Sequence, residues 1–311
     1  TLFIRFCGEH CWWCSPHYSK GDGPLEIIEI LKAVILGIIQ GITEWLPVSS
    51  TGHMILFDSF WPMDPNQFSG GKAFIDLFLV VIQFGSILAV LVLYFHKLNP
   101  FSPKKTQVEK RQTFSLWLKV IFAVIPAMVL GLLFDDLIND LFYNAITVAI
   151  MLILFGIFFL IVENRNRRPK IQNYNQLHGK TLLLIGLFQA LAMIPGTSRS
   201  GATILGAVLL GCSRSVAAEF SFFLAIPTML GASALKIFKY FKDYGFGFTS
   251  NELIILLTGM VVAFLVSMLV IRLFMGFIRK HDFKPFGWYR IVLGILILVL
   301  FFCNVLTLSP A

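Results

Sequence analysis

Two polar stops interrupt apolar, helix-like sequence in this chain, and each carries side chains that can do chemistry. The first stop is Pro47-Val48-Ser49-Ser50-Thr51-Gly52-His53, and the second is Pro195-Gly196-Thr197-Ser198-Arg199-Ser200-Gly201-Ala202-Thr203. A lipid interior cannot hydrogen-bond open backbone, so irregular segments at membrane depth persist only where protein buries them or where they line a wet cavity. The two stops therefore predict one shared functional cavity.

The groups at the stops favour an anion such as phosphate. A helix that begins at each stop points unpaired N–H groups and a positive dipole end into the cavity. Arg199 adds a planar fork that suits phosphate or carboxylate, and its charge requires an anionic partner at that depth. The hydroxyl groups that can contribute hydrogen bonds are those of Ser49, Ser50, Thr51, Ser198, Ser200 and Thr203.

Glu44 and His53 can supply acid–base chemistry beside such an anion. Glu44 makes sense there as a metal ligand, a general base, or a partner of Arg199 or His53, and His53 as a nucleophile or a general acid or base. Structural alternatives stay open: hydroxyls that bond back to the preceding turn, a purely structural Arg–Glu pair, and an ordinary helical histidine. The conjunction of ionisable groups favours function. We expect Glu219, which precedes Ser221, to join the same network.

Composition places the chain in a membrane. Of its 311 residues, 57% are hydrophobic and 14% are charged, and the mean hydropathy is +0.80, whereas soluble domains carry about 25% charged residues. The net charge of +8 comes from basic residues in short loops, as the positive-inside rule expects, so we expect no nucleic-acid partner. No long polar linker separates two cores, and residues 24–311 are predicted to form one membrane domain.

Six apolar runs are long enough to cross a bilayer, which needs about 20 residues. They lie near residues 74–97, 115–134, 142–163, 216–241, 252–278 and 286–308. Two shorter apolar stretches, residues 33–46 and 181–194, each end at one of the stops, and short apolar runs follow at 54–61 and 204–212. Each stop is therefore predicted to be the tip of a re-entrant hairpin, which enters and leaves on one side.

The order of these elements repeats. Pro195 follows Pro47 at almost the same interval as Gly231 follows Gly85, which indicates an internal duplication of residues 25–163 and 179–308. Each half then contains one hairpin and three crossings, and an odd number of crossings inverts the second half. The predicted fold is an all-α integral membrane protein with two inverted-topology repeats, whose broken helices meet near the midplane.

Loop charges orient this arrangement. Basic residues gather in three loops, which we expect to be cytoplasmic; these residues are Lys97, Lys104, Lys105, Lys110, Arg111, Arg165, Arg167, Arg168, Lys170, Lys180, Arg279, Lys280 and Lys284. Lys236, Lys239 and Lys242 disagree, because they fall on the predicted outer side. The majority places both termini outside, in a multi-pass plasma membrane protein whose active site opens to the extracytoplasmic side.

Residues 1–23 stand apart from the apolar sequence. They contain three cysteines and two histidines, Cys7, Cys11, Cys14, His10 and His17, without a two-part ligand spacing. We expect a poorly ordered or non-native extension rather than a zinc site. Cys212 and Cys303 lie in apolar runs and are interpreted as small core residues.

The two stops also resemble a known family. The runs from Gln40 to His53 and from Pro195 to Thr203 are similar to the two signatures of bacterial undecaprenyl-diphosphate phosphatases of the bacitracin-resistance type. The similarity extends from about residue 25 to the C-terminus and covers Glu219-Phe220-Ser221-Phe222. It implies a membrane enzyme that removes one phosphate from undecaprenyl diphosphate, recycling the lipid carrier for peptidoglycan synthesis, with a divalent cation. Many family members have Glu where this chain has Gln40.

The resemblance also implies roles for single residues. Arg199 and the N–H groups after Pro195, including those of Gly196 and Thr197, would hold the diphosphate. Glu44, with Gln40 one turn earlier, would bind Mg²⁺ or Ca²⁺. His53 is the preferred nucleophile or base for water; Ser50 is the main alternative, for which His53 is the expected base.

An alternative hypothesis assigns transport, rather than hydrolysis, to the same cavity. Inverted repeats with broken helices are also a transporter architecture, so a carrier or lipid flippase is the alternative function. Membrane lipid is an expected partner in either case, and a homo-oligomer is open.

Overall fold

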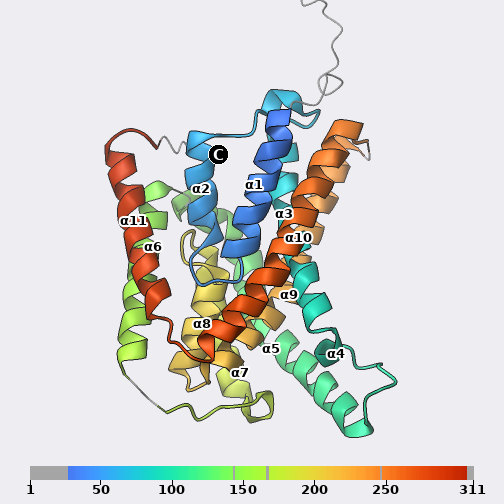
Figure 1. Cartoon of the computed structure of the whole chain (residues 1–311), viewed down its shortest axis with the longest axis vertical. Helices are drawn as coiled ribbons and strands as arrows, with labels where there is room; N and C mark the ends of the chain where they lie inside the picture. The colour runs from blue at the N-terminus through green and yellow to red at the C-terminus, as the bar shows by residue number, and fades with distance from the viewer. Residues whose placement is uncertain (1–26, 143, 166–167, 246, 307–311) are drawn as a thin grey trace, which may run out of the picture.

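The computed structural model describes residues 27–142, 144–165, 168–245 and 247–306, and helices dominate these residues (Figure 1). Among these residues, six helices are long and apolar enough to cross a membrane, which agrees with the six predicted crossings. They are α3 (Lys72–Leu93), α5 (Gln107–Phe142), α6 (Ala145–Asn164), α9 (Arg214–Tyr244), α10 (Ser250–Ile278) and α11 (Lys284–Phe302). The predictions for residues 1–23 fall outside the described residues.

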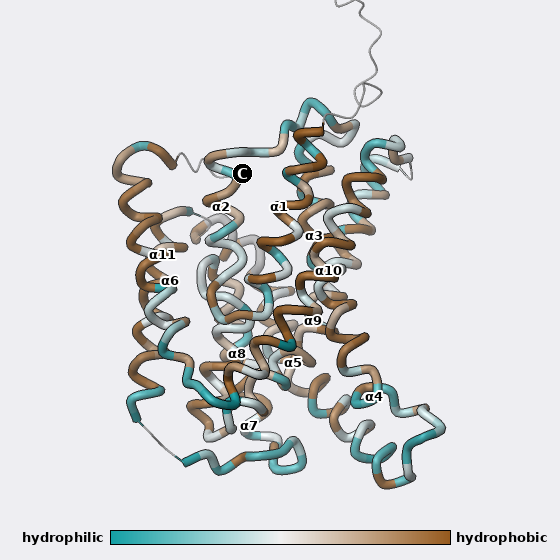
Figure 2. Tube along the Cα trace, viewed as in Figure 1, coloured by the Kyte–Doolittle hydropathy of each residue, from teal (hydrophilic) through white to brown (hydrophobic). Residues whose placement is uncertain are grey.

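The surface of the bundle is that of a membrane protein. Large apolar side chains stay exposed along the spanning helices, among them Leu118 on α5 and Leu265 on α10. Hydrophobic colour runs along the helices in Figure 2, and hydrophilic colour gathers in the loops at their ends. Because exposed apolar surface on this scale is stable only against lipid, the chain is a multi-pass membrane protein.

Two hairpins of shorter helices enter the bundle from opposite ends (Figure 1). The first consists of α1 (Ile27–Thr43) and α2 (Ser50–Phe60), and the second of α7 (Gly179–Ala190), η3 (Leu191–Met193) and α8 (Arg199–Leu209). Pro47 and Pro195 lie just after the entering leg, where a residue without an N–H cannot continue a helix. The predicted hairpins are therefore present, with their tips at the two polar stops.

The entering leg of each hairpin packs closely against a spanning helix of the other half. A Cβ atom on Gly41 of α1 would lie 2.9 Å from the Ala263 carbonyl oxygen of α10. A Cβ atom on Gly186 of α7 would collide with the Ala123 carbonyl oxygen of α5. Glycine at both positions permits this backbone approach. The reciprocal packing is what an inverted repeat requires, and the repeat itself stays a prediction.

A buried aromatic cluster surrounds the tips. Trp45, at the end of the first entering leg, is fully buried, and its ring meets Phe222 of α9 edge-to-face with a centroid distance of 5.2 Å. Phe222 in turn packs against Phe274 of α10. The short helices η1 (Pro65–Gln67), α4 (Phe95–Leu98) and η2 (Tyr174–Gln176) lie in the connections. The tips are thus held by a close-packed core rather than by lipid.

Candidate active site

The two tips share one backbone geometry. Ser49, the N-cap of α2, and Ser198, the N-cap of α8, both have a φ of 71°, which few residues other than glycine adopt. Such a conformation costs on the order of 1–3 kcal/mol and persists only when its surroundings enforce it. Each strained serine is followed at once by a helix, so Ser50 and Arg199 occupy the same first position of their helices.

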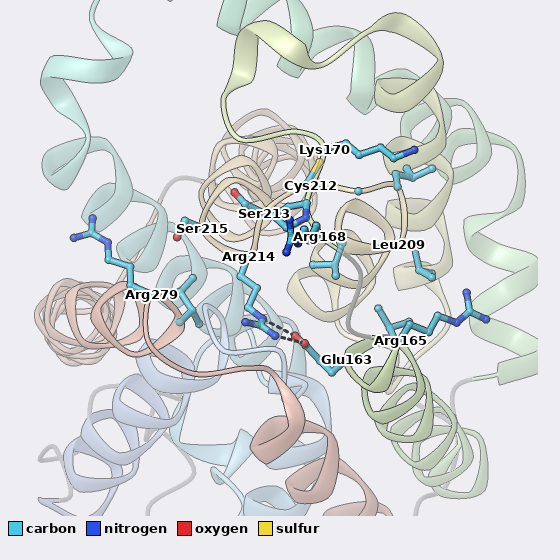
Figure 3. Close-up of a pocket in the computed structure, with 16 residues that line it drawn as sticks. Glu163, Arg165, Arg168, Lys170, Leu209, Cys212, Ser213, Arg214, Ser215 and Arg279 are labelled. Carbon is cyan, nitrogen blue, oxygen red and sulfur yellow. Dashed lines mark hydrogen bonds and ion pairs between the residues drawn. The ribbon is translucent and has the colours of Figure 1, made fainter.

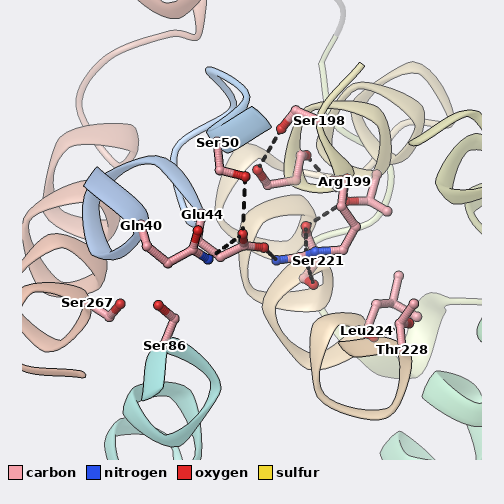
Figure 4. A network of polar contacts seen from close by, with 12 residues as sticks. Gln40, Glu44, Ser50, Ser86, Ser198, Arg199, Ser221, Leu224, Thr228 and Ser267 are labelled. Carbon is pink, nitrogen blue, oxygen red and sulfur yellow. Dashed lines mark hydrogen bonds and ion pairs between the residues drawn. The ribbon is translucent and has the colours of Figure 1, made fainter. Parts of the chain in front are cut away.

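Glu44 and Arg199 join the two tips through a buried ion pair. Arg199 Nη2 lies 3.0 Å from Glu44 Oε1, and both side chains are about one-tenth exposed. Arg199 Nη1 donates to the Ser221 carbonyl oxygen at 2.7 Å (Figure 4). The guanidinium stands over the Trp45 ring. The guanidinium is therefore held between both hairpins and α9, and removal of either charge would leave the other buried and unpaired.

The second oxygen of Glu44 accepts from two neighbours. Gln40 Nε2 donates to Glu44 Oε2 at 3.0 Å, and Ser50 Oγ donates to the same oxygen at 3.4 Å (Figure 4). A carboxylate that already accepts a hydroxyl hydrogen is in position to act as a general base. The group that accepts from the Ser50 hydroxyl is thus Glu44, whereas the sequence had led us to expect His53 as the base beside Ser50.

His53 faces away from this ion pair. Its Nδ1 lies 2.7 Å from the Ser49 carbonyl oxygen, and its Nε2 lies 2.7 Å from the hydroxyl of Tyr289 on α11. Because a carbonyl only accepts, Nδ1 carries the hydrogen, and in the neutral ring Nε2 then accepts from Tyr289. Both ring nitrogens are engaged, and neither has a hydrogen bond to Glu44, Ser50 or Arg199 among the described residues.

The other hydroxyl groups at the tips divide into two kinds. Ser49 Oγ and Thr197 Oγ1 are fully buried and have no hydrogen-bond partner among the described residues, so each keeps an unused hydrogen bond. The Thr203 hydroxyl instead bonds back to the Arg199 carbonyl oxygen at 2.8 Å and to Ser221 Oγ. For Thr203 the structure thus has the back-bonded arrangement that the structural alternative described.

Of three further predicted site residues, Ser198 and Ser200 make structural hydrogen bonds and Thr51 makes none among the described residues. Ser198 Oγ caps α8 by accepting from the Gly201 N–H at 3.2 Å, and Ser200 Oγ donates to the Leu46 carbonyl oxygen at 3.0 Å. Thr51, in the first turn of α2, makes no side-chain hydrogen bond within the described ranges. Ser200 therefore ties the second tip to the first, as the ion pair does.

Gly196 has a backbone conformation and a close backbone contact that only glycine permits. Its φ is 91°, and a Cβ atom there would collide with the Val148 carbonyl oxygen of α6. Glycine is therefore required on both grounds, the positive φ and the close approach.

Arg290 of α11 is a buried residue at the tips that our reading of the sequence missed. It is fully buried and donates to the carbonyl oxygens of Pro47 at 3.2 Å, Gly196 at 2.9 Å and Thr197 at 2.9 Å. One guanidinium thus satisfies open backbone of both tips, as backbone at membrane depth requires. The signal in the sequence was an arginine inside the last apolar run.

Comparison with known proteins places both tips in a known family. The family model described as "Bacitracin resistance protein BacA" matches residues 33–296, which include both tips and Arg290. The chain belongs to this BacA family. Curated relatives named undecaprenyl-diphosphatase include one from Clostridioides difficile, 63% identical over 89% of this chain and 98% of the relative. Another, from Acetivibrio thermocellus, is 57% identical over 90% of this chain and all of the relative.

One prediction for this BacA family member is wrong. Glu219 does not join the Glu44–Arg199 network, because its Oε2 accepts from Lys97 Nζ at 2.5 Å and from the Tyr174 hydroxyl. Its neighbour Ser221 does join, through the contacts with Arg199 and Thr203. On a helix, positions two apart point in different directions, so the shared sequence segment did not imply a shared site.

The donor set of the BacA tips fits a divalent cation only with help from the substrate. Glu44 is the one carboxylate in the network, and the described residues contain no cluster of three His, Cys, Asp or Glu side chains. Gln40 donates through Nε2, so its amide oxygen is the atom that can serve as a second ligand. Mg²⁺ is commonly held in this way, by one or two protein oxygens together with phosphate oxygens and water.

Proposed function

We propose that this chain hydrolyses undecaprenyl diphosphate to undecaprenyl phosphate and inorganic phosphate, the activity that the names of its relatives describe. The observation that supports it best is the ion pair of Glu44 and Arg199 between two helix N-termini, with the Ser50 hydroxyl on the carboxylate. This arrangement combines an anion site, a base and a nucleophile. The product is the lipid carrier for peptidoglycan synthesis, and its recycling would give bacitracin resistance.

The first step of the proposed mechanism uses Ser50 as nucleophile. Ser50 Oγ attacks the terminal phosphorus while its proton passes to Glu44 Oε2, and the bond from that phosphorus to the bridging oxygen breaks. Undecaprenyl phosphate leaves with the bridging oxygen. Arg199 turns from Glu44 toward the phosphate and stabilises the charge that develops on its oxygens. This revises our preference for His53, which hydrogen-bonds Ser49 and Tyr289 instead.

In the second step water releases the phosphate. Glu44 first gives the proton from Ser50 to the departing undecaprenyl phosphate. It then takes a proton from water as the water oxygen attacks the phosphoserine, and it passes that proton to Ser50 Oγ as the phosphorus–Oγ bond breaks, so the enzyme returns to its starting state. Direct attack by water, with Glu44 or His53 as base, is the alternative path and forms no phosphoenzyme. In either path the unpaired hydroxyls of Ser49 and Thr197 would be further donors to the phosphate.

A divalent cation would act together with Glu44 and Gln40. When bound to these residues and to the diphosphate, Mg²⁺ or Ca²⁺ would neutralise part of the phosphate charge. The Gln40 amide is a weaker ligand than a carboxylate, so Glu44 would supply the negative charge that binds the cation. Arg199, on the second tip, would then neutralise the remaining negative charge of the phosphate.

The prenyl chain has a candidate groove beside the first hairpin. A cavity of about 370 Å³ lies between α1 and α2, lined by His53 and by the apolar side chains of Ile39, Leu56, Phe57, Phe60 and Trp61. Burial of apolar surface contributes about 25 cal/mol per Å², which favours a hydrocarbon occupant. A lipid tail in this groove would bring its headgroup toward the tip of the same hairpin.

Phosphate release by the purified protein tests the proposal. The protein in detergent should release inorganic phosphate from a C55 or shorter prenyl diphosphate, and a preparation with Glu44→Gln should release far less. Movement of the intact diphosphate across vesicles without phosphate release would support the transporter alternative instead.

For orientation we propose that the tips are reached from the extracytoplasmic side, because the basic loops mark the cytoplasmic side. Single cysteines in a cysteine-free background test this with an impermeant reagent. Cys303 is exposed, so our expectation that it is a core residue was wrong. Restored alone, it should be labelled from outside, as should Asn66→Cys, and Lys104→Cys should be labelled only after the cells are opened. Labelling of Lys104→Cys and Cys303 from the same side would overturn both the orientation and the inverted repeat.

A further inference from the structure

A second polar cavity lies at the end of the bundle where the basic loops gather. It has a volume of about 870 Å³ and forms where α6, α8 and α10 end and α9 begins (Figure 3). Neither Glu44 nor Arg199 lines it. This cavity is therefore distinct from the candidate active site at the two tips.

Positive charge dominates this cavity. Its lining includes five basic side chains and one carboxylate; the basic residues are Arg165, Arg168, Lys170, Arg214 and Arg279, and the carboxylate is Glu163. Glu163 is already used, because it accepts from Arg214 Nε at 3.0 Å, from Arg214 Nη2 at 2.5 Å and from the Phe283 N–H at 3.1 Å. The other four basic side chains have no ion pair within the described ranges. Their charges are left for an anion that is not part of the chain.

The walls of the cavity are fixed by backbone hydrogen bonds. The N–H groups of Lys170 and Ile171 donate to the Gly211 carbonyl oxygen at 2.9 and 3.0 Å, and the Ser213 N–H donates to the Ile171 carbonyl oxygen at 2.8 Å. These bonds tie the segment that carries Lys170 to the turn between α8 and α9. The first turn of α9, whose N-terminal N–H groups favour an anion, is therefore held beside Lys170.

We propose that this cavity binds the phosphate of an anionic phospholipid headgroup. The basic side chains follow directly on the apolar ends of spanning helices, which is the depth at which headgroups lie. The lining is also partly apolar, with Val162, Val208, Leu210 and Ile278 beside the charges. Such a wall suits the glycerol and upper acyl carbons of a lipid, whereas free phosphate would gain nothing from it. The inference does not depend on the hydrolytic activity.

Native mass spectrometry of the purified chain tests the proposal. The protein is placed in neutral detergent micelles doped with phosphatidylglycerol or phosphatidylcholine, and the retained lipids are counted. We expect phosphatidylglycerol to be retained in preference to phosphatidylcholine. The triple variant Arg168→Gln/Lys170→Gln/Arg279→Gln should bind phosphatidylglycerol about tenfold more weakly or worse, since each basic residue near a headgroup contributes several-fold.

A second triple variant controls for net charge. Lys104→Gln/Lys110→Gln/Arg111→Gln removes the same charge from the loop before α5 and from the start of that helix, outside the cavity, and should leave lipid retention unchanged. Equal loss in both triple variants would mean diffuse attraction and would overturn the proposal. If the cavity triple does not fold, Arg279→Gln alone should still lower retention, and an unchanged value would count against the site.

A competition experiment with inorganic phosphate distinguishes a lipid phosphate from free phosphate as the ligand of this cavity. Excess phosphate should displace retained phosphatidylglycerol poorly, because it lacks the apolar contacts. If radiolabelled phosphate binds the lipid-free protein tightly, and this binding is lost in the cavity triple, the site holds free phosphate and the lipid assignment is wrong.

Discussion

The two hairpin tips have the same backbone and different chemistry. Both turn through a serine with a φ of 71°, and both start a helix at the next residue. In the first tip that residue is Ser50 and the carboxylate of Glu44 stands beside it, whereas in the second it is Arg199. In the proposed mechanism the first tip thus supplies a base and a nucleophile, and the second supplies the positive charge.

The two N-cap serines also differ. Ser198 has a structural contact, whereas Ser49 has none among the described residues that would explain its burial. Ser198 caps its helix through the Gly201 N–H, whereas Ser49 makes no cap and its buried Oγ has no partner within the described ranges. A buried unpaired hydroxyl costs about 1–3 kcal/mol. Of the two N-cap serines, only Ser49 bears this cost, which is what a ligand-binding group is expected to show.

The largest expected effect comes from the second tip. Arg199→Ala should lower turnover on the order of 10³-fold or more, because the fork meets charge that grows in the transition state. Arg199→Lys should recover part of the rate, since an ammonium keeps the charge but not the bidentate geometry. Phosphate release per folded protein is the measurement. Near-normal turnover in Arg199→Ala would remove this residue from the site.

At the first tip, Ser50 and His53 should separate clearly. Ser50→Ala should lose about 10³-fold in turnover, and His53→Ala about tenfold, if Ser50 is the nucleophile and His53 only supports the tip. Trapped phosphoenzyme decides the matter, because phosphoserine survives acid and phosphohistidine does not. An acid-labile adduct on His53 would restore our first preference, and solvent ¹⁸O in phosphate without any adduct would make water the attacker.

Glu44 should link the first tip to the cation. Glu44→Gln should lose about 10²-fold in rate as the base is removed, and should also demand more Mg²⁺ or Ca²⁺. Gln40→Glu should be tolerated or lower the cation requirement, because a second carboxylate adds favourable charge at an oxygen-ligand site. Cation titrations of both variants check this. Identical titrations in the two variants and the unmodified chain would contradict the cation assignment.

The smallest effect should appear in stability. Ser198→Ala removes a helix cap and should destabilise the fold by about 1 kcal/mol, whereas Ser49→Ala removes no cap and should leave the fold as stable or more so. The order should reverse in activity, with Ser49→Ala the more damaged. Melting in detergent and phosphate release, measured together, test this. Equal destabilisation by both changes would mean that Ser49 is structural.

Much of the fold was predictable because membrane helices leave strong local signals. Six apolar runs gave the six spanning helices, and Pro47 and Pro195 marked the tips. The cluster of Glu44, Arg199 and Ser50 was also predicted, since ionisable groups at membrane depth gather where they can pair. The Glu219 prediction failed because it relied on proximity in the sequence, while the direction of the side chain depends on how α9 is turned.

The sequence by itself determined that this chain crosses a membrane, that two hairpins interrupt it, and that their polar residues favour a phosphate. Composition, run length and proline position suffice for this, because lipid tolerates so few alternatives. The tertiary structure decided which polar groups touch. That Glu44, and not His53, receives the Ser50 hydrogen, and that Arg290 satisfies the carbonyl groups of both tips, depends on rotations and contacts between helices distant in sequence, which no local pattern encodes.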